Sequence, residues 1–300
     1  MSQPASTSAP PADPAQRRLI QVLFVGVFMT ALDSAIVSPV LPALREAFGI
    51  DNRTAGLLTT VFALSSMFST ALMAYLNDRH GRRLVYLVSV ALFAVGSLCI
   101  ALAPGFDSLL VSRVVQGLGA GGIAPVASAV IGDVFTVERR GGIWGLIGAT
   151  HGMAFVLGPP LATLITSTLG WRWVFLVNIQ VAGVVLVWGA RSLPRQRNTV
   201  PPGPMDWPGI ALTLLVLLCL VLGISRLADT ATGLLLWPWF LVASGVLLVT
   251  LIAVESRQPQ PMIPTQLFAN RQLTVVYVRT LGVGFSMGGI VFLTTVATSA

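Results

Sequence analysis

Charged side chains are scarce in this 300-residue sequence, of which 10% is charged and 55% is hydrophobic. A soluble domain carries about 25% charged residues, so the composition excludes an ordinary soluble protein and predicts a membrane protein. Lysine is absent, and all 18 basic residues, which give a net charge of +7, are arginines. These arginines lie in short breaks between apolar runs and form no continuous stripe, which argues against a nucleic-acid partner.

The sequence contains only two cysteines and none of the common catalytic motifs. Cys99 and Cys219 both lie inside apolar runs, a placement that predicts neither a disulfide framework nor a zinc site. The polar segments contain no Ser/His/Asp set, no group of metal ligands and no glycine-rich phosphate loop. We therefore expect neither an enzyme nor a bound metal or other cofactor.

What the sequence does contain is a series of apolar stretches, most of them close to the roughly 20 residues that a helix needs to cross a bilayer. Nine such stretches cover residues 19–41, 55–76, 84–102, 109–134, 143–169, 173–190, 210–224, 234–254 and 273–300. The first imitates a signal peptide, but it continues long enough to span and many more spans follow. We predict an all-α membrane protein, a helical bundle with about nine transmembrane helices.

The most polar break between two of these stretches is the segment AYLNDRHGRR. Its charged residues Asp78, Arg79, Arg82 and Arg83 cannot lie in hydrocarbon, and Gly81 allows the backbone to turn tightly. A short basic turn between two spans is a cytoplasmic loop by the positive-inside rule. This assignment places the N-terminus in the cytoplasm.

The other arginines support the same orientation. Twelve fall on the predicted cytoplasmic side, namely Arg17, Arg18, Arg79, Arg82, Arg83, Arg139, Arg140, Arg191, Arg195, Arg197, Arg257 and Arg271. Four fall on the outer side, namely Arg45, Arg53, Arg172 and Arg226. We expect a multi-pass protein of the cell membrane, either a plasma or an inner membrane, with a cytoplasmic N-terminus.

Polar connections divide the chain into segments. Residues 1–16 are rich in Pro, Ala and Ser and are expected to form a disordered cytoplasmic tail, and residues 17–193 hold six spans. A proline-rich cytoplasmic linker at 194–208 precedes two further central helices at 209–257. Residues 258–300 form a cytoplasmic connection and one last span, which ends without a charged flank, so we expect that the chain is cut off there.

Two charged residues lie inside the predicted spans. By the helical rise of about 1.5 Å per residue, Asp33 and Arg113 both fall in the outer half of the membrane. A protonatable Asp33 beside Arg113 could couple protons to transport, because charged groups within a span are costly and usually functional. A structural ion pair, or two groups solvated separately, are the alternatives, and contact between the two helices does not follow from the sequence.

Three further features lie within the spans. Arg113 and Gln116 share a helix face followed by Gly117 and Gly119, which would let another helix or a substrate approach closely; packing alone is the alternative. His151 is either a neutral side chain bonded to a backbone carbonyl or a proton relay or substrate contact.

The fifth span is interrupted by a proline. At Gly158 and Pro159 the missing backbone N–H of proline is expected to kink the helix.

Together, these motifs resemble the major facilitator superfamily, and within it the fourteen-span drug:proton antiporters. The loop after the second span is similar to the superfamily signature G-x-L-x-D-R-x-G-R-R, with matches at Leu76, Asp78, Arg79, Gly81, Arg82 and Arg83. The fourth span carries the full L-x-x-x-R-x-x-Q-G-x-G pattern at Leu109, Arg113, Gln116, Gly117 and Gly119. Of the antiporter signature in the fifth span, Gly158 and Pro159 are kept.

The resemblance implies a six-helix N-terminal lobe built as two inverted repeats, two extra helices, and the first helix of an incomplete second lobe. It also implies that Asp78 and the nearby arginines latch the cytoplasmic side in one state, and that Asp33 and Arg113 take part in proton coupling.

We therefore expect a transporter that exports amphipathic drugs or organic compounds by alternating access, driven by the proton motive force and monomeric when full length. Its partners would be a small-molecule substrate, protons and the lipid bilayer. A proton-coupled importer of a sugar or metabolite, and a non-transporting remnant or half-transporter, are the alternatives.

Overall fold

The computed structural model describes residues 13–194, 206–227, 237–258, 273–276, 278–280 and 282. Within these residues the regular structure is entirely helical and comprises eight complete helices. They are α1 (Pro14–Phe48), α2 (Asn52–His80), α3 (Arg82–Ala101), α4 (Phe106–Val134), α5 (Val137–Thr168), α6 (Trp171–Ser192), α7 (Trp207–Leu227) and α8 (Trp237–Glu255).

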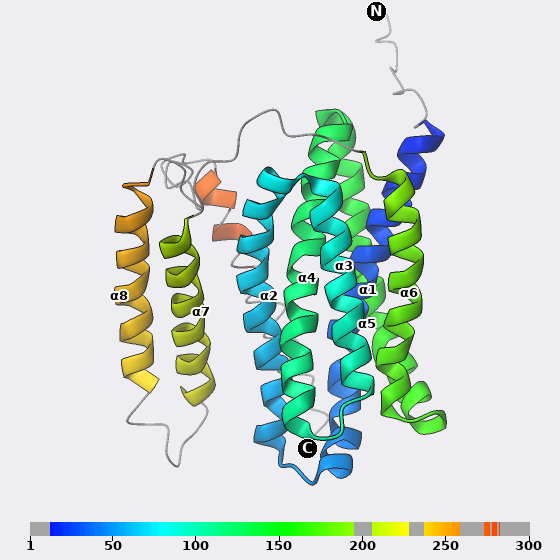
Figure 1. Cartoon of the computed structure of the whole chain (residues 1–300), viewed down its shortest axis with the longest axis vertical. Helices are drawn as coiled ribbons and strands as arrows, with labels where there is room; N and C mark the ends of the chain where they lie inside the picture. The colour runs from blue at the N-terminus through cyan, green and yellow to red at the C-terminus, as the bar shows by residue number, and fades with distance from the viewer. Residues whose placement is uncertain are drawn as a thin grey trace, which may run out of the picture.

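Six helices, α1 to α6, form one bundle, and α7 and α8 form a pair that stands beside α2 (Figure 1). Within the bundle, α4 packs between α2 and α3, while α1 packs against α5 and α6. Two apolar cores fill the bundle, one around Tyr86, Phe93 and Ile123 and the other around Val40 and Ile100.

Seven of the helices in the described part of the chain are long and apolar enough to cross a membrane, namely α1 to α6 and α8. The apolar part of α7 is shorter and covers Trp207–Gly223. The predicted fold class, an all-α membrane bundle, is confirmed. Eight of the nine predicted spans correspond to α1 to α8, and the ninth, at 273–300, lies largely outside the described residues.

The ends of α1 are set by local capping. The side chain of Asp13 accepts a hydrogen bond from the backbone N–H of Ala15 at 3.4 Å, and Pro14 occupies the first turn. Both features favour helix initiation, so residues 14–16, which were expected to belong to the disordered tail, are helical. Residues 1–12 lie outside the described part. The helix ends at Gly49, which has a φ of 62° and thus a left-handed conformation that glycine adopts without strain.

The loop between α2 and α3 consists of a single residue. Gly81 has a φ of 86°, ends α2 and precedes the first residue of α3. Side chains with a Cβ rarely adopt this conformation, which explains why the tight basic turn contains glycine. Because α3 begins directly after it, the charged residues on both sides of Gly81 lie at one end of the bundle.

Candidate functional site

A cluster of buried polar side chains is centred on the carboxylate of Asp33 in α1. Arg113 in α4 donates a hydrogen bond to its Oδ2 atom at 2.8 Å. Gln116 and Asn178 donate through their amide nitrogens to its Oδ1 atom, at 2.9 and 2.8 Å. Asp33 has an exposed fraction of 0% and Arg113 one of 1%, so this ion pair is removed from solvent and is stable only because its hydrogen bonds are made internally.

The cationic side of the pair is also enclosed. The Arg113 guanidinium lies over the ring of Phe62 in α2, 4.7 Å from its centroid, and 5.5 Å from the centroid of Phe175 in α6. Arg113 also donates to the side-chain oxygen of Gln116. Aromatic faces attract a desolvated cation, so the two rings supply part of the stabilisation that water would otherwise give.

Gln116 links this ion pair to α3. Its amide nitrogen also lies 2.8 Å from the hydroxyl oxygen of Ser97, and that hydroxyl donates to the backbone carbonyl of Phe93 at 2.9 Å. The cluster therefore joins α1, α3, α4 and α6 through side chains that are all buried. A displacement of any one of these helices would break hydrogen bonds made by the others.

Glycines bring the helices close enough for these contacts. A Cβ placed on Gly96 in α3 would lie 2.5 Å from the Cα of Gln116, and one on Gly119 would lie 2.6 Å from an α3 carbonyl, that of Ser89. A Cβ on Gly117 would lie 2.8 Å from the carbonyl of Phe62 in α2. These separations are shorter than real Cβ contacts, so Gly117 and Gly119 are sites of close helix packing.

A cavity of about 520 Å³, which Phe62 helps to line, lies between α1, α2, α4 and α5. It is lined by Thr30, Ala31, Ser34, Phe62, Ser66, Thr70, Ala120, Gly121, Ala124, Pro125, Ser128, His151 and Phe155. Five of these residues carry a hydroxyl group and two are phenylalanines, and none is an arginine or a carboxylate. Such a surface suits an uncharged compound that has both apolar and hydrogen-bonding parts.

His151 lies on this cavity in α5. Its Nδ1 atom is 3.1 Å from the backbone carbonyl of Ile147. Because a carbonyl only accepts, Nδ1 carries the hydrogen in this contact, which leaves Nε2 of the neutral ring as an acceptor. The structure therefore contains the hydrogen bond to a backbone carbonyl that the sequence suggested. It also places the ring where a bound compound could reach it.

Further along α5, Gly158 is a packing position. A Cβ on this residue would lie 2.7 Å from the Cβ of Ala35 in α1. Pro159 follows it inside the helix, where it supplies no backbone N–H. The contact at Gly158 therefore holds α5 against the same helix that carries Asp33.

The basic loop residues lie at the ends of several helices. Arg82 forms an ion pair with Asp133 near the end of α4 and donates to the carbonyl of Ala129, and Arg83 donates to the carbonyl of Ala190 in α6. Arg79 lies in the last turn of α2. Asp78 is exposed and lies near enough to Arg82 for their opposite charges to interact. In this conformation the structure thus brings Arg82 and Arg83 together with α4 and α6, and it places Asp78 near Arg82.

The family of the chain can be established by comparison with known proteins. A family model described as Major Facilitator Superfamily matches residues 23–300. The chain belongs to the Major Facilitator Superfamily. This superfamily consists of membrane transporters, so the expectation that the chain is not an enzyme is confirmed.

Two bacterial relatives illustrate the similarity. The chain is 32% identical to the multidrug transporter protein MdtP of Bacillus subtilis over 274 residues, which are 90% of this chain and 49% of that protein. It is 35% identical to the uncharacterized MFS-type transporter YfiU of the same organism over 213 residues, which are 71% of this chain and 41% of that protein. The chain thus spans about half the length of the curated relatives that it matches.

Solved structures of the superfamily share the fold. The human organic anion transporter MFSD10 (TETRAN) aligns with a TM-score of 0.57 at 21% identity, over 68% of this chain and 55% of that one. The POT family transporter PepTSo aligns with a TM-score of 0.55 at 18% identity, over 81% of this chain and 53% of that one. At these identities the likeness concerns the arrangement of helices.

Some residues of the buried cluster in this superfamily member were not predicted from the sequence. Asn178 stands at the end of the segment WRWVFLVN, inside an apolar span. The rule that singled out Asp33, that a polar side chain within a span has a reason to be there, would have found it too. Ser97 and Phe62 carry no such signal, because serine and phenylalanine are ordinary residues in transmembrane helices.

Proposed function

We propose that the protein exports amphipathic drugs or other organic compounds in exchange for protons, as a member of the fourteen-span drug:proton antiporter branch. The observation that carries this proposal is the Asp33 carboxylate, which is fully buried in a pair with Arg113 beside a cavity of suitable size. Two relatives from Bacillus subtilis are named for drug transport or resistance, the multidrug transporter protein MdtP and multidrug resistance protein 3. Their names support an organic compound as the substrate.

The coupling step begins with a proton that binds to Asp33. The neutral acid no longer compensates Arg113, and an unpaired buried charge costs about 3–5 kcal/mol relative to the intact pair. Protonation therefore raises the free energy of the conformation seen here by that amount. A conformation in which Arg113 contacts water or another partner does not have this cost. Protonation thus shifts the population between two states of the transporter, as alternating access requires.

Phe62 connects the substrate cavity with the proton site. Its ring lines the cavity and lies 4.7 Å from the Arg113 guanidinium. Thr30 and Ser34 also line the cavity and flank Asp33 on α1. A compound that moves Phe62 or α1 therefore changes the surroundings of the ion pair, so substrate and proton act on the same set of helices.

The proton motive force drives export, and no other cofactor takes part. The protein lies in the plasma or inner membrane as a monomer with its N-terminus in the cytoplasm, where the arginine-rich helix ends also lie. The helix ends on the two sides of Gly81, which carry Asp78, Arg79 and Arg82, hold the cytoplasmic side closed in one state.

A second candidate is proton-coupled uptake of a sugar or metabolite. The hydroxyl-rich lining of the cavity favours it, because Thr30, Ser34, Ser66, Thr70 and Ser128 could exchange hydrogen bonds with a polyhydroxylated compound. The two candidates differ in direction. Export appears as accumulation inside everted membrane vesicles, and uptake appears as accumulation in intact cells.

The test uses everted vesicles that contain the protein as its native gene encodes it. With an acidic vesicle lumen, we expect accumulation of a fluorescent amphipathic compound that a protonophore abolishes. Asp33→Asn should remove this accumulation. Asp51→Asn makes the same chemical change at an exposed helix cap and should preserve it. Gradient-driven accumulation that persists unchanged in Asp33→Asn would exclude the coupling role, and accumulation only of sugars by intact cells would favour the importer.

A further inference from the structure

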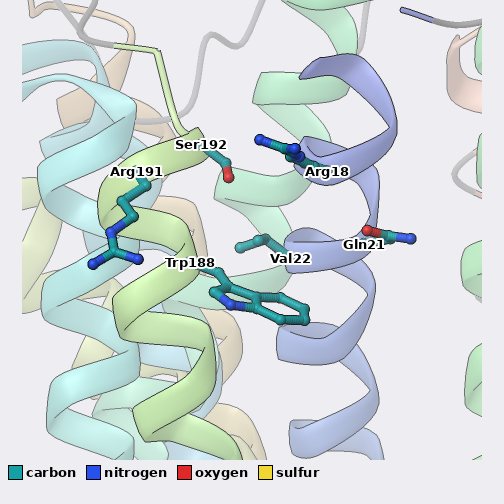
Figure 2. Close-up of a pocket in the computed structure, with 6 residues that line it drawn as sticks. All are labelled: Arg18, Gln21, Val22, Trp188, Arg191 and Ser192. Atoms are coloured by element: carbon teal, nitrogen blue, oxygen red, sulfur yellow. The ribbon is translucent and has the colours of Figure 1, made fainter. Parts of the chain in front are cut away.

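A second pocket lies away from the cavity, at the end of the bundle where α1 begins and α6 ends. It has a volume of about 330 Å³ and is lined by Arg18, Gln21, Val22, Trp188, Arg191 and Ser192. In Figure 2 the Arg18 side chain reaches from α1 towards Ser192, and the Trp188 ring reaches from α6 towards α1, while Arg191 extends down the outer side of α6. The pocket shares no lining residue with the cavity.

The charge of this pocket is positive and uncompensated. None of its six lining residues is acidic, and the two arginines are exposed. Within the described part of the chain, neither Arg18 nor Arg191 makes an ion pair or a hydrogen bond through its side chain. Arg82 and Arg83, at the same end of the bundle, are by contrast engaged with α4 and α6. Ser192 adds a neutral donor beside Arg18, so the upper part of the pocket can bind an anion with several oxygens.

The lower part of the pocket is apolar. Val22 is 1% exposed and forms a buried floor, whereas the Trp188 ring is 48% exposed. Trp188 precedes Arg191 by three residues and therefore lies about 4.5 Å deeper along the helix. Val184 and Val187 are also exposed on α6 and continue this apolar face towards the middle of the membrane. Tryptophan is favoured at the boundary between head groups and acyl chains.

From this arrangement we infer that the groove between α1 and α6 is a binding site for an anionic phospholipid. The phosphate lies beside Arg18 and Ser192, Arg191 adds positive charge from the outer side of α6, and the first part of an acyl chain lies on Trp188. Basic pockets between transmembrane helices at the cytoplasmic surface bind anionic head groups in this way. The site is separate from substrate transport, so it stands even where the proposed function does not.

The experiment measures lipid binding to the purified protein, made from its native gene and kept in mild detergent. Phosphatidylglycerol and phosphatidylcholine with the same acyl chains are titrated separately, and native mass spectrometry counts the bound lipids. We expect one phosphatidylglycerol to bind in preference to phosphatidylcholine. Each arginine near an anionic surface strengthens binding about five-fold, so Arg18→Gln with Arg191→Gln should reduce the preference about thirty-fold.

The matched control removes the same charge on the same predicted side of the membrane. Arg139→Gln with Arg257→Gln changes two arginines that line neither pocket and should leave the preference unchanged. Equal binding by the wild type and by the pocket variant would overturn the inference, as would an equal loss in both double variants. A separate titration with glycerol 1-phosphate tests a soluble source of the phosphate. If this compound binds at the two arginines and the lipid does not, the lipid assignment is wrong.

Discussion

Replacement of Asp33 by asparagine tests the buried ion pair most directly, because it changes one oxygen to an NH₂ group at constant shape. Two amide donors contact Oδ1 of Asp33 and the Arg113 guanidinium contacts Oδ2. An asparagine must keep its oxygen towards the two amides, so its NH₂ group faces the guanidinium at the site of a 2.8 Å hydrogen bond. The variant therefore loses a charge and also sets two donors against each other.

The expected cost follows from the burial of both groups. Removal of one partner from a buried pair costs about 3–5 kcal/mol, because the other charge is left uncompensated. Arg113→Met should destabilise for the same reason, since it leaves the carboxylate with amide donors alone. In the double variant neither charge is present, and the cost falls to that of one unpaired buried amide, about 1–3 kcal/mol. The two changes should therefore be coupled by about 3 kcal/mol or more.

The assay is the free energy of unfolding of the four proteins in mild detergent, measured by titration with a denaturant. Asp33→Asn combined with Arg172→Gln serves as a control, because Arg172 lies at the start of α6 against Trp171 and outside the cluster. The control pair should be additive within about 0.5 kcal/mol. If Asp33→Asn and Arg113→Met are additive to the same degree, the pair does not contribute as an ion pair and the coupling mechanism proposed above is refuted.

Three further changes test other parts of the structure. Gly119→Val forces a side chain against an α3 carbonyl and should lower the free energy of unfolding by about 1–3 kcal/mol or more, whereas Gly145→Val, with nothing within 4 Å of its Cβ position, should not. Arg82→Gln breaks a partly exposed pair, so stability should change by less than about 1 kcal/mol, while transport in vesicles falls if the loop acts as a latch. The hydrogen bonds from Thr54 hold the pKa of the Asp51 carboxyl below its ordinary value. Its contribution to stability is therefore complete above about pH 3.9 and is lost as the pH falls through the lower folded value, which thermal melts of Asp51→Asn should show as a flatter acid limb.

The sequence predicts the helices well because each span needs an unbroken apolar run, which leaves a strong local signal. The start of α1 lies before the predicted end of the tail, because Asp13 caps the helix and Pro14 occupies its first turn. Within the cluster, the rise along a helix places Asp33 and Arg113 at similar depth, but it does not show which helices are neighbours. The contact of Asp33 with Arg113, and its contact with Asn178 of α6, depend on how the helices pack. Asp33 and Asn178 are 145 positions apart in the chain.

For the glycines of α4, too, the sequence does not show which helix is the neighbour. Their spacing predicts that α4 is approached closely, yet Gly117 meets α2 and Gly119 meets α3. A spacing pattern identifies the smooth faces of a helix and leaves the partner undefined. The positive charge of the segment around Gly81 likewise predicts a membrane boundary and does not identify a partner for Arg82. Arg82 pairs with Asp133 because α4 ends close to it.

The burial of Asp33 and Arg113 also constrains how this protein can change in evolution. Loss of either residue alone leaves a charge without solvent or partner, so an intermediate with one substitution is much less stable than either end point. Asp33 also accepts hydrogen bonds from Gln116 and from Asn178 of α6, so residues of these helices depend on the presence of the carboxylate as well. Among descendants of this sequence, the two charged positions are expected to be kept together or replaced together, and the amides should vary once the carboxylate is gone.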